Sequence, residues 1–348
     1  MKHRARHQQG MAVIAALLVV GAATVIASTM LRGQSERARL VQSERSRAQA
    51  RWLLLGGVEW GRQILRETAR HSPITSMDQP WALPIVDLRL DPPGESEPAL
   101  LSGRIEDEQG KFNLQNLAVQ GQVDPRQLVA FERLLQALNL RPSVAPVIAR
   151  RIAAGQPQAA RDAVDNGATA AAGSGVTAPR NTNTGNTDAG NTSTGAGNAA
   201  TGNTAKAVRP PLAPGVQSLE DLRGIAGIDD EALQRLRCCA TVLPEQSPIN
   251  VNTAPPEVIY AVVAPLPLGQ AVAMAAERDR GRYFNDAADF ANRLANPAIR
   301  LDKDGIATDS LWFSLSGVVR LGHATAAMQA LLERDEQSTR LVWMREMN

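Results

Sequence analysis

The beginning of the chain changes abruptly from polar to apolar. Residues 1–10 are polar and basic and contain no acid, whereas residues 11–31 contain no charged residue. At ~1.5 Å of rise per residue, a helix over the second range would be roughly 31 Å long, about the thickness of bilayer hydrocarbon. No proline interrupts the run. The pattern therefore predicts a transmembrane helix at residues 11–31.

A cleaved secretory signal is the alternative interpretation of this region. Val25-Ile26-Ala27 would supply a small-residue cleavage site, and the mature chain would then start near Ser28. The apolar stretch of such a signal is usually about 7–15 residues, which is shorter than this run. Basic residues flank the run on both sides, so the positive-inside rule alone does not fix its orientation.

The pattern after residue 31 predicts that the same helix continues to about residue 70. Val41, Ala48, Trp52 and Leu55 fall near heptad spacing, with arginines and glutamates between them. This spacing predicts a helix that packs through an apolar stripe on its own domain.

Shorter elements follow. Six prolines between Ser72 and Pro98 predict extended segments and turns. Residues 102–113 predict a hairpin with Gln109-Gly110 in its turn. Asp124 and Pro125 predict the start of a helix. Further helices are expected at about 143–154, 218–227, 229–236, 252–263 with Asn252 or Thr253 as cap, 269–280 and from 284 onward, and strands at 311–316 and 340–346. Residues 324–334 fit a helix or a strand.

One internal segment differs in composition from the rest. Between Ala168 and Ala205 nearly every residue is Ala, Gly, Asn, Thr or Ser. Such a segment buries too little apolar surface to offset the entropy of ordering it. We therefore expect a flexible loop over about residues 156–212.

Composition narrows the classes of function. The chain has 37 Lys and Arg against 35 Asp and Glu, a net charge of +2, which argues against a broad basic surface for nucleic acid. Of the common catalytic motifs, the nucleophile elbow, the Walker loop and the zinc-protease helix are all missing, so we do not expect an enzyme. The adjacent Cys238 and Cys239 are expected as partly buried free thiols, because a bond between neighbours strains the backbone.

The junction Gly10-Met11 resembles a type IV prepilin cleavage site. The resemblance implies that a prepilin peptidase cuts after Gly10, on the cytoplasmic side of the membrane, and methylates the amino group of Met11. Most pilin-like subunits carry a glutamate at the fifth mature position, which here is Ala15. A carboxylate inside a bilayer costs about 2.5–3.5 kcal/mol unless it meets a partner charge. A subunit without it suits the tip of a fibre, and this absence resembles the minor pseudopilin K family of the type II secretion system.

Two further stretches resemble conserved segments of that family. Residues 105–117 resemble its "DE-x-GK-x-NLN-x-L" segment, and residues 249–255 resemble its "INVNTAP" segment. The motif positions carried over to this chain are Asp107, Glu108, Gly110, Lys111, Asn113, Leu114, Asn250, Asn252 and Thr253.

The resemblance implies an α+β, type IV pilin-like fold. It would consist of a long N-terminal transmembrane helix, a small antiparallel sheet and a large inserted α-helical domain. The implied divisions are a leader (1–10), a transmembrane helix (11–31), its periplasmic continuation (32–70), the first part of the sheet region (71–118), the inserted domain (119–300, with a helix-hairpin-helix-like part at about 216–295) and the last part of the sheet region (301–348). The family comparison also favours a strand at 324–334.

The function implied is that of a minor pseudopilin at the pseudopilus tip, which helps to initiate pseudopilus assembly and the export of folded proteins across the outer membrane. Its implied partners are other minor pseudopilins, the major pseudopilin and the prepilin peptidase. It would cross the inner membrane once, with a cytoplasmic N-terminus and a periplasmic bulk. We expect no cofactor, with calcium kept as the one ligand to consider: relatives bind it, and Asp302, Asp304 and Asp309 resemble part of a hard-cation loop.

Two other functions stay open. The region from Asn252 to Phe290 resembles a helix-hairpin-helix module, which would indicate a DNA-binding protein of a competence-like system. Its turn at residues 264–269 contains one glycine and two prolines, which supply few N–H groups for phosphate, so we expect no nucleic-acid partner. A tip subunit of a type IV pilus is the other alternative.

Overall fold

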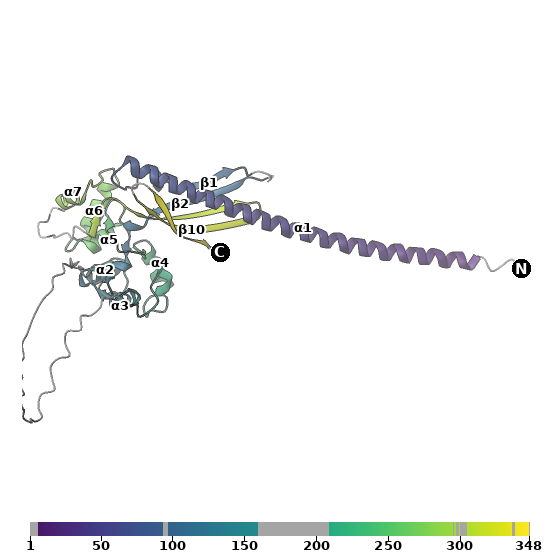
Figure 1. Ribbon diagram of the computed structural model, residues 1–348, viewed down its shortest axis with the longest axis horizontal. Helices are drawn as coiled ribbons and strands as arrows, with labels where there is room; N and C mark the ends of the chain where they lie inside the picture. The colour runs from purple at the N-terminus through teal and green to yellow at the C-terminus, as the bar shows by residue number, and fades with distance from the viewer. Residues whose placement is uncertain are drawn as a thin grey trace, which may run out of the picture.

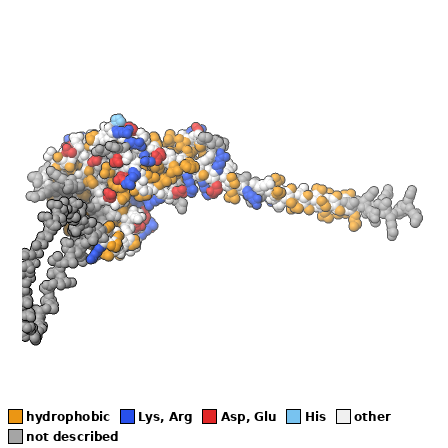
Figure 2. All heavy atoms as spheres, viewed as in Figure 1, with side chains coloured by type: hydrophobic (Ala, Val, Ile, Leu, Met, Phe, Trp, Pro, Cys, Tyr) orange, Lys and Arg blue, Asp and Glu red, His pale blue; other side chains and the backbone are white. Residues whose placement is uncertain are grey.

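A single long helix dominates the molecule. The computed structural model describes residues 6–92, 97–158, 209–294, 296, 299, 305–335 and 338–347. The helix α1 (Arg6–His71) has 66 residues; it projects from a compact head at its N-terminal end and lies along the head at its C-terminal end (Figure 1). Its segment Val13–Arg32 is long and apolar enough to cross a membrane, and none of it is buried against the rest of the chain. Hydrophobic side chains cover the part of α1 that projects from the head (Figure 2), and this segment fits a single-pass membrane anchor.

The head contains one five-stranded sheet. Its strands are β1 (Ile85–Leu90), β2 (Ala99–Asp107), β9 (Trp312–Leu321), β10 (Ala324–Arg334) and β11 (Thr339–Met347). They lie in the order β1-β2-β9-β10-β11, and every neighbouring pair is antiparallel. The short helix η1 (Pro80–Ala82) precedes β1. The expected strands near 311–316 and 340–346 are therefore confirmed, and the ambiguous segment 324–334 is a strand.

The C-terminal part of α1 packs on one face of this sheet. Ala50, Leu54, Val58 and Leu65 recur every four or seven residues along the helix and are all buried in the core against the strands. Of the heptad-spaced residues expected to make this contact, Leu55 packs against this core, whereas Val41, Ala48 and Trp52 are exposed, which corrects the expectation for those three. The stripe that the fold buries is the one centred on Leu54.

Helix and sheet approach closely because glycines lie between them. A side chain on Gly61 would place its Cβ 2.4 Å from Leu315 of β9, and one on Gly317 would come within 3.2 Å of Leu54. The two glycines thus let the helix backbone and the strand backbone come near enough for the large side chains on either side to interlock.

Everything between β2 and β9 is an insertion into the sheet, because those two strands are neighbours (Figure 1). Its described elements are η2 (Glu108–Gly110), β3 (Phe112–Asn113), η3 (Leu114–Leu117), β4 (Ala118–Val119), β5 (Gln122–Val123), α2 (Pro125–Ala137), η4 (Pro142–Val144), α3 (Ala145–Gly155), η5 (Leu219–Leu222), α4 (Asp230–Arg237), β6 (Ala240–Thr241), β7 (Ile249–Asn250), α5 (Pro256–Val262), α6 (Leu268–Arg278), α7 (Ala287–Arg293) and β8 (Ile306–Ala307).

The insertion has its own hydrophobic core, separate from the core under α1. Phe112, Leu134, Ile148 and Phe290 are buried in it together with most of the apolar residues of α2 to α7. Because Phe112 already belongs to this core, the insertion begins near Glu108 rather than at the expected residue 119.

The expected hairpin at residues 102–113 is wrong. After β2 the chain enters η2, and β3 then pairs in parallel with β6 instead of folding back on β2. The two strands beside β2 are β1 and β9. A Gln-Gly pair indicated a turn correctly, but the strand that follows the turn belongs to the second core.

Most of the expected helices are present. Asp124 caps α2 by accepting hydrogen bonds from the backbone N–H groups of Arg126 and Gln127. The segment expected as a helix at 218–227 contains only the short η5. The expected cap of α5 is also wrong, because the helix starts after Pro255, whereas Asn252 and Thr253 form contacts elsewhere in the fold.

The two cysteines form a disulfide, which corrects the expectation of free thiols. Cys238 is exposed and Cys239 is buried in the core of the insertion. The pair lies between α4, which ends at Arg237, and β6, which begins at Ala240.

The expected flexible loop lies outside the described residues, apart from its two ends. Those ends meet: the backbone N–H of Gln158 donates to the carbonyl of Arg209 at 3.0 Å, and the N–H of Arg209 donates back at 2.9 Å. Leu212 and Ala213 then donate to the carbonyl of Ala154. The segment between Gln158 and Arg209 therefore leaves and rejoins the head at one point.

This closure predicts that the segment is dispensable for folding. A two-residue Asn-Gly turn can connect two residues that are hydrogen-bonded to each other through their backbones, as Gln158 and Arg209 are. Replacing residues 159–208 by Asn-Gly should leave the head folded and raise its free energy of unfolding by up to about 3 kcal/mol, because each doubling of a closed loop costs about 0.6 kcal/mol. The measurement is denaturant unfolding of the detergent-solubilised full chain and of the variant, followed by circular dichroism. As a control, the same dipeptide in place of residues 154–213 removes the closing bonds and should destabilise; lower stability of the first variant would contradict the prediction.

Candidate functional site

The two family-like segments meet at the base of the insertion. Asp107, the last residue of β2, is buried, and one of its carboxylate oxygens accepts three side-chain hydrogen bonds. The donors are the Asn250 amide at 3.1 Å, the Thr253 hydroxyl at 2.6 Å and the Ser310 hydroxyl at 2.6 Å. The other oxygen accepts from the backbone N–H of Gln109 at 2.8 Å. Segments more than 140 residues apart in the chain are joined through this carboxylate.

Gly110 is required by the closeness of the two segments. A Cβ at this position would lie 2.8 Å from the Thr253 hydroxyl and 3.1 Å from its backbone carbonyl atoms. The backbone of the first segment therefore packs directly on the backbone of the second. This contact gives a physical reason for glycine between Glu108 and Lys111 that does not depend on a left-handed conformation.

The two asparagines of the second segment connect three parts of the chain. The Asn250 amide also donates to the carbonyl of Thr75, in the loop after α1, at 3.1 Å. The Asn252 side chain accepts from the backbone N–H of Phe284 at 2.8 Å and donates to its carbonyl at 2.9 Å. Both asparagines are fully buried. The two side-chain amides thus join segments that are not paired with each other in a sheet.

Asn113 has a similar role on the other side of the junction. Its amide donates to the carbonyl of Glu245 at 2.7 Å, and its oxygen accepts from the backbone N–H of Leu243 at 3.1 Å. The neighbouring Leu114 is fully buried in the core of the insertion. These residues tie the first family-like segment to the stretch that follows β6.

Arg334 closes the junction from the sheet side. Its guanidinium is buried, donates to the Thr75 hydroxyl at 2.6 Å and to the carbonyl of Ser310 at 2.7 Å, and lies over the ring of Phe313. Burial lowers the pKa of Arg334, while the nearby charge of Asp107 opposes that change. Sequence reasoning missed Thr75, Ser310 and Arg334, because single polar residues in three separate segments give no motif or spacing to find them.

Two opposing effects set the pKa values of the charged groups at the junction: burial, and nearby charges or hydrogen-bond donors. Removal from water raises the pKa of Asp107, and its four hydrogen-bond donors oppose that rise. For Glu108, burial acts in the same direction, but the ammonium of Lys111 at 3.0 Å and several hydrogen bonds outweigh it and hold the pKa below its ordinary value. Burial would lower the pKa of Lys111, yet Glu108 and Glu106 together raise it. The buried ion pair is therefore charged at neutral pH.

This arrangement fastens two structural units together. The carboxylate of Asp107 is saturated with donors, and the charge of Glu108 is matched by Lys111. Among the described residues there is no group of three or more His, Cys, Asp or Glu side chains placed to hold a metal ion. Asp302 and Asp304 lie outside the described residues and Asp309 is exposed, so the calcium loop stays a prediction.

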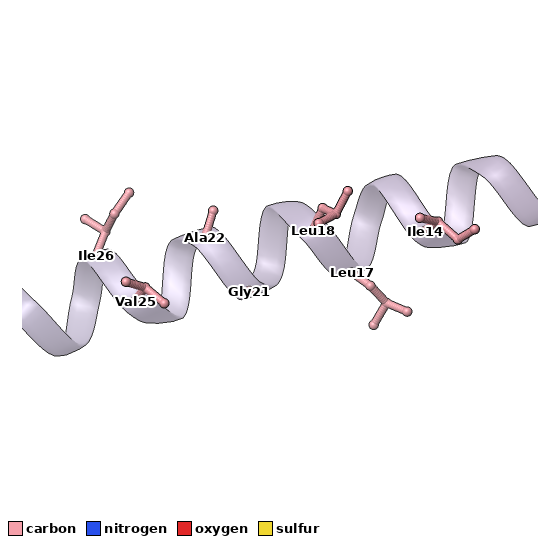
Figure 3. A pocket seen from close by; sticks show the side chains of 7 residues that line it. All are labelled: Ile14, Leu17, Leu18, Gly21, Ala22, Val25 and Ile26. Atoms are coloured by element: carbon pink, nitrogen blue, oxygen red, sulfur yellow. The ribbon is translucent and has the colours of Figure 1, made fainter.

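The expected processing site lies at the far end of the molecule. The backbone helix of α1 runs through Gly10 and Met11, and the Met11 side chain is 77% exposed. Ala15 follows one turn later, also exposed. A shallow hollow on this anchor is lined by side chains that point away from the helix axis (Figure 3). Its residues are Ile14, Leu17, Leu18, Gly21, Ala22, Val25 and Ile26, all within the apolar span.

The helix-hairpin-helix-like region uses its polar groups internally. Arg278 is buried and donates to the carbonyls of Val251 and Ala254 at 3.0 and 2.6 Å. Arg133 of α2 donates to the carbonyls of Tyr260 and Leu266, at the turn between α5 and α6. Arg133 thus stabilises the turn and Arg278 the segment before α5, so both guanidinium groups bond within the fold.

Comparisons with known proteins agree on one family. Residues 110–245 and residues 249–309 each match a family model described as type II secretion system protein K, and together they cover more than half of the chain. The type II secretion system protein K of Pseudomonas aeruginosa is 26% identical over 98% of this chain and 93% of its own length. A chain in the crystal structure of the GspK-GspI-GspJ complex from enterotoxigenic Escherichia coli has a similar fold, with a TM-score of 0.56, 15% identity, and coverage of 88% of this chain and 99% of its own length.

The junction predicts a large effect of Asp107→Asn. The amide nitrogen of asparagine cannot accept the hydrogen bonds that Asn250, Thr253 and Ser310 donate, so at least one buried donor loses its partner. The free energy of unfolding should fall by about 1–3 kcal/mol. Asp91→Asn, an exposed carboxylate at the end of β1, is the matched control and should change it by less than about 0.5 kcal/mol. Urea unfolding at pH 7 measures both, and equal effects would mean that the network contributes nothing.

The ion pair predicts a pH-dependent effect of Lys111→Met. At pH 7 the variant leaves Glu108 buried without its partner and should lose about 3–5 kcal/mol of stability. The lowered pKa of Glu108 contributes stability above its unfolded pKa of about 4.5, and this contribution is lost as pH falls through the folded pKa. The deficit of the variant should therefore narrow below pH 4.5. Arg51→Met, which breaks an exposed pair with Glu346, should cost less than about 1 kcal/mol at either pH. A deficit that stays constant with pH would contradict this account.

Proposed function

This chain belongs to the type II secretion system protein K family, and we propose that it stands at the tip of the pseudopilus. It is a minor pseudopilin of the type II secretion system. One observation carries the proposal about its place: the helical insertion widens the head at the end far from the membrane anchor (Figure 1). A head of this shape leaves no room for a subunit stacked directly above it, which suits the last position of a fibre.

The architecture supports a pilin-like interpretation of the fold. A long N-terminal helix packs lengthwise on a small antiparallel sheet, and the insertion enters between the neighbouring strands β2 and β9. We infer that α1 and the sheet form the pseudopilin part and that α2 to α7 form the added tip domain. The Asp107 junction then holds the added domain in a fixed orientation on the pseudopilin part.

The ends of α1 support a proposal about processing and orientation. The prepilin peptidase would cut between Gly10 and Met11 on the cytoplasmic side and methylate the new amino group. The apolar span would stay in the inner membrane, and the head would lie in the periplasm. Ala15 in place of the usual acid fits a subunit that has no neighbour ahead of it whose amine needs a counter-charge.

The partners proposed are the other minor pseudopilins and, below them, the major pseudopilin. The structure with a similar fold is a complex of GspK with GspI and GspJ, and counterparts of those two proteins are the first candidates here. Together these subunits would initiate pseudopilus assembly and so support export of folded proteins across the outer membrane. The proposed role is structural and involves no catalytic step.

Mass spectrometry of the mature chain tests the processing, and secretion by the same strains tests whether export depends on it. The chain purified from native membranes should begin at Met11 and be heavier by one methyl group. Gly10→Val should block processing, because a β-branched side chain replaces the glycine at the cleaved bond, and secretion should stop. Val13→Ile, inside the span and past the cleavage site, is the control and should be processed and functional. A mature start near Ser28 would instead show a secretory signal, and loss of a pilus with secretion intact would favour the pilus alternative.

Electron microscopy with a label on the head tests the tip position. Gold bound to an epitope inserted between Gln158 and Arg209, where the chain leaves and rejoins the head, should appear once per pseudopilus and at its end. Label distributed along the shaft would contradict the tip assignment while leaving the family assignment intact.

A further inference from the structure

The outward face of α3 carries two adjacent arginines beside an exposed valine. Val147, Arg150 and Arg151 lie within about 100° of arc on a helix with 3.6 residues per turn, and all three are exposed. Ile148 and Ile152, on another face of the same helix, are buried in the core of the insertion. The helix is therefore amphipathic, and its arginine-bearing face is turned toward solvent.

The segment that rejoins the head after residue 208 extends this face. The backbone N–H groups of Leu212 and Ala213 donate to the carbonyl of Ala154, at 2.9 and 3.0 Å, so the segment crosses the C-terminal end of α3. Arg209 is exposed, and Leu212 is 77% exposed. We call this region the arginine surface and define it by five residues: Val147, Arg150, Arg151, Arg209 and Leu212.

The positive charge of the arginine surface has no acidic counterpart in the described part of the fold. Residues 133–158 and 209–219 contain five arginines and no Asp or Glu. Among the described residues, the guanidinium groups at positions 150, 151 and 209 form no ion pair. Other exposed arginines of the insertion do pair with acids: Arg223 with Asp230, Arg235 with Glu231, Arg237 with Glu220 and Arg282 with Glu277.

The dipole of α3 accounts for only part of this arrangement. Cations near the C-terminal end of a helix are stabilising, which gives Arg150 and Arg151 a local role. Arg209 lies outside the helix, however, and an exposed Leu212 adds nothing to the stability of α3. Guanidinium groups interleaved with exposed apolar side chains are typical of the surfaces through which proteins bind other proteins.

The composition of the arginine surface favours an acidic protein over a nucleic acid. Proteins that bind duplex DNA contact about 6–10 phosphates, whereas this surface offers three arginines. A guanidinium group binds a carboxylate through two parallel hydrogen bonds. Val147 and Leu212 require apolar groups between those carboxylates. A protein surface supplies both kinds of group within a short distance.

We propose that the arginine surface binds an acidic patch on the folded proteins that the system exports, and that it selects those proteins by charge. The surface belongs to the insertion, and α3 lies far from the membrane anchor, on the side of the head away from α1 (Figure 1). Contacts made through α1 therefore leave it open to a protein that approaches the head from the periplasm. The inference rests on the proposed function, because only a subunit at the end of the fibre presents the whole insertion to such a protein.

Site-specific crosslinking in secreting cells tests the contact. A photoreactive phenylalanine in place of Val147, in the full chain, should form adducts with proteins that disappear from the medium when the chain is deleted. The crosslinked peptides, identified by mass spectrometry, should be rich in Asp and Glu. Val86 of β1 is the matched control position, because it is an exposed valine outside the insertion. A probe there should give no adduct with an exported protein.

Charge reversal tests the selection. Arg150→Glu combined with Arg151→Glu should lower both the adduct yield at position 147 and the export of the crosslinked proteins by about tenfold, because like charges then face each other. The control is Arg223→Glu combined with Arg235→Glu, which changes the charge of the insertion equally and should leave both unchanged.

Two further variants separate charge from folding. Arg150→Lys combined with Arg151→Lys keeps the positive charge and should keep export within about twofold of wild type. Arg209→Glu leaves α3 unaltered and should lower the adduct yield by about threefold. Adducts only with another pseudopilin, equal losses in the control pair, or a yield insensitive to Arg150, Arg151 and Arg209 would overturn the proposal.

The same cells separate this inference from the proposed function. A probe chain that is processed at Met11 and supports secretion, yet forms no adduct with an exported protein through position 147, overturns the arginine surface alone. A wild-type chain that is not processed or does not support secretion overturns the proposed function, whatever the crosslinks show.

Discussion

The structure depends on one buried carboxylate whose hydrogen bonds join two folding units. Asp107 ends a strand of the pseudopilin sheet, and its donors come from the insertion and from the segment that leads back into the sheet. Each unit has its own apolar core, and a small third cluster of Leu243, Trp312 and Leu331 lies between them. Where the units meet, the fold also uses a buried polar network, at a cost in desolvation that its donors offset. The directional bonds of this network then set the orientation of the insertion together with the small apolar cluster.

The choice of polar residues at this junction has a physical reason. A hydrophobic contact between two units is non-directional and tolerates sliding, whereas a carboxylate with four fixed donors is satisfied in one arrangement only. Glu108 and Lys111 add a second constraint of the same kind, since either charge alone would be buried without compensation. Gly110 brings the two backbones close enough for both sets of bonds to form. An insertion held in this way moves with the sheet as one body.

How much of this the sequence predicts depends on the range of the interaction. The span, the capped helix α2 and the strands at the C-terminal end follow from local periodicity and capping, and the structure has them. The motif residues are visible in the sequence, but their contacts are not, because Thr75, Ser310 and Arg334 come from distant segments without a pattern. The wrong hairpin and the wrong cap of α5 have the same cause. Both segments contain the polar and small residues that turns and caps require, but contacts with distant parts of the chain determine what these residues bind.

The two faces of α1 show why a periodic pattern needs a structure to be interpreted. The helix carries one apolar stripe around Leu54 and another around Trp52, and both fit helical spacing. Gly61 and Gly317 favour the stripe around Leu54, because the large side chains Leu315 and Leu54 occupy the space that a Cβ at either glycine would take. The other stripe keeps a heptad spacing that a sheet does not require. The contact that the sheet does take sets the position of the insertion as well, because Asp107 at the end of β2 joins the insertion to the same sheet.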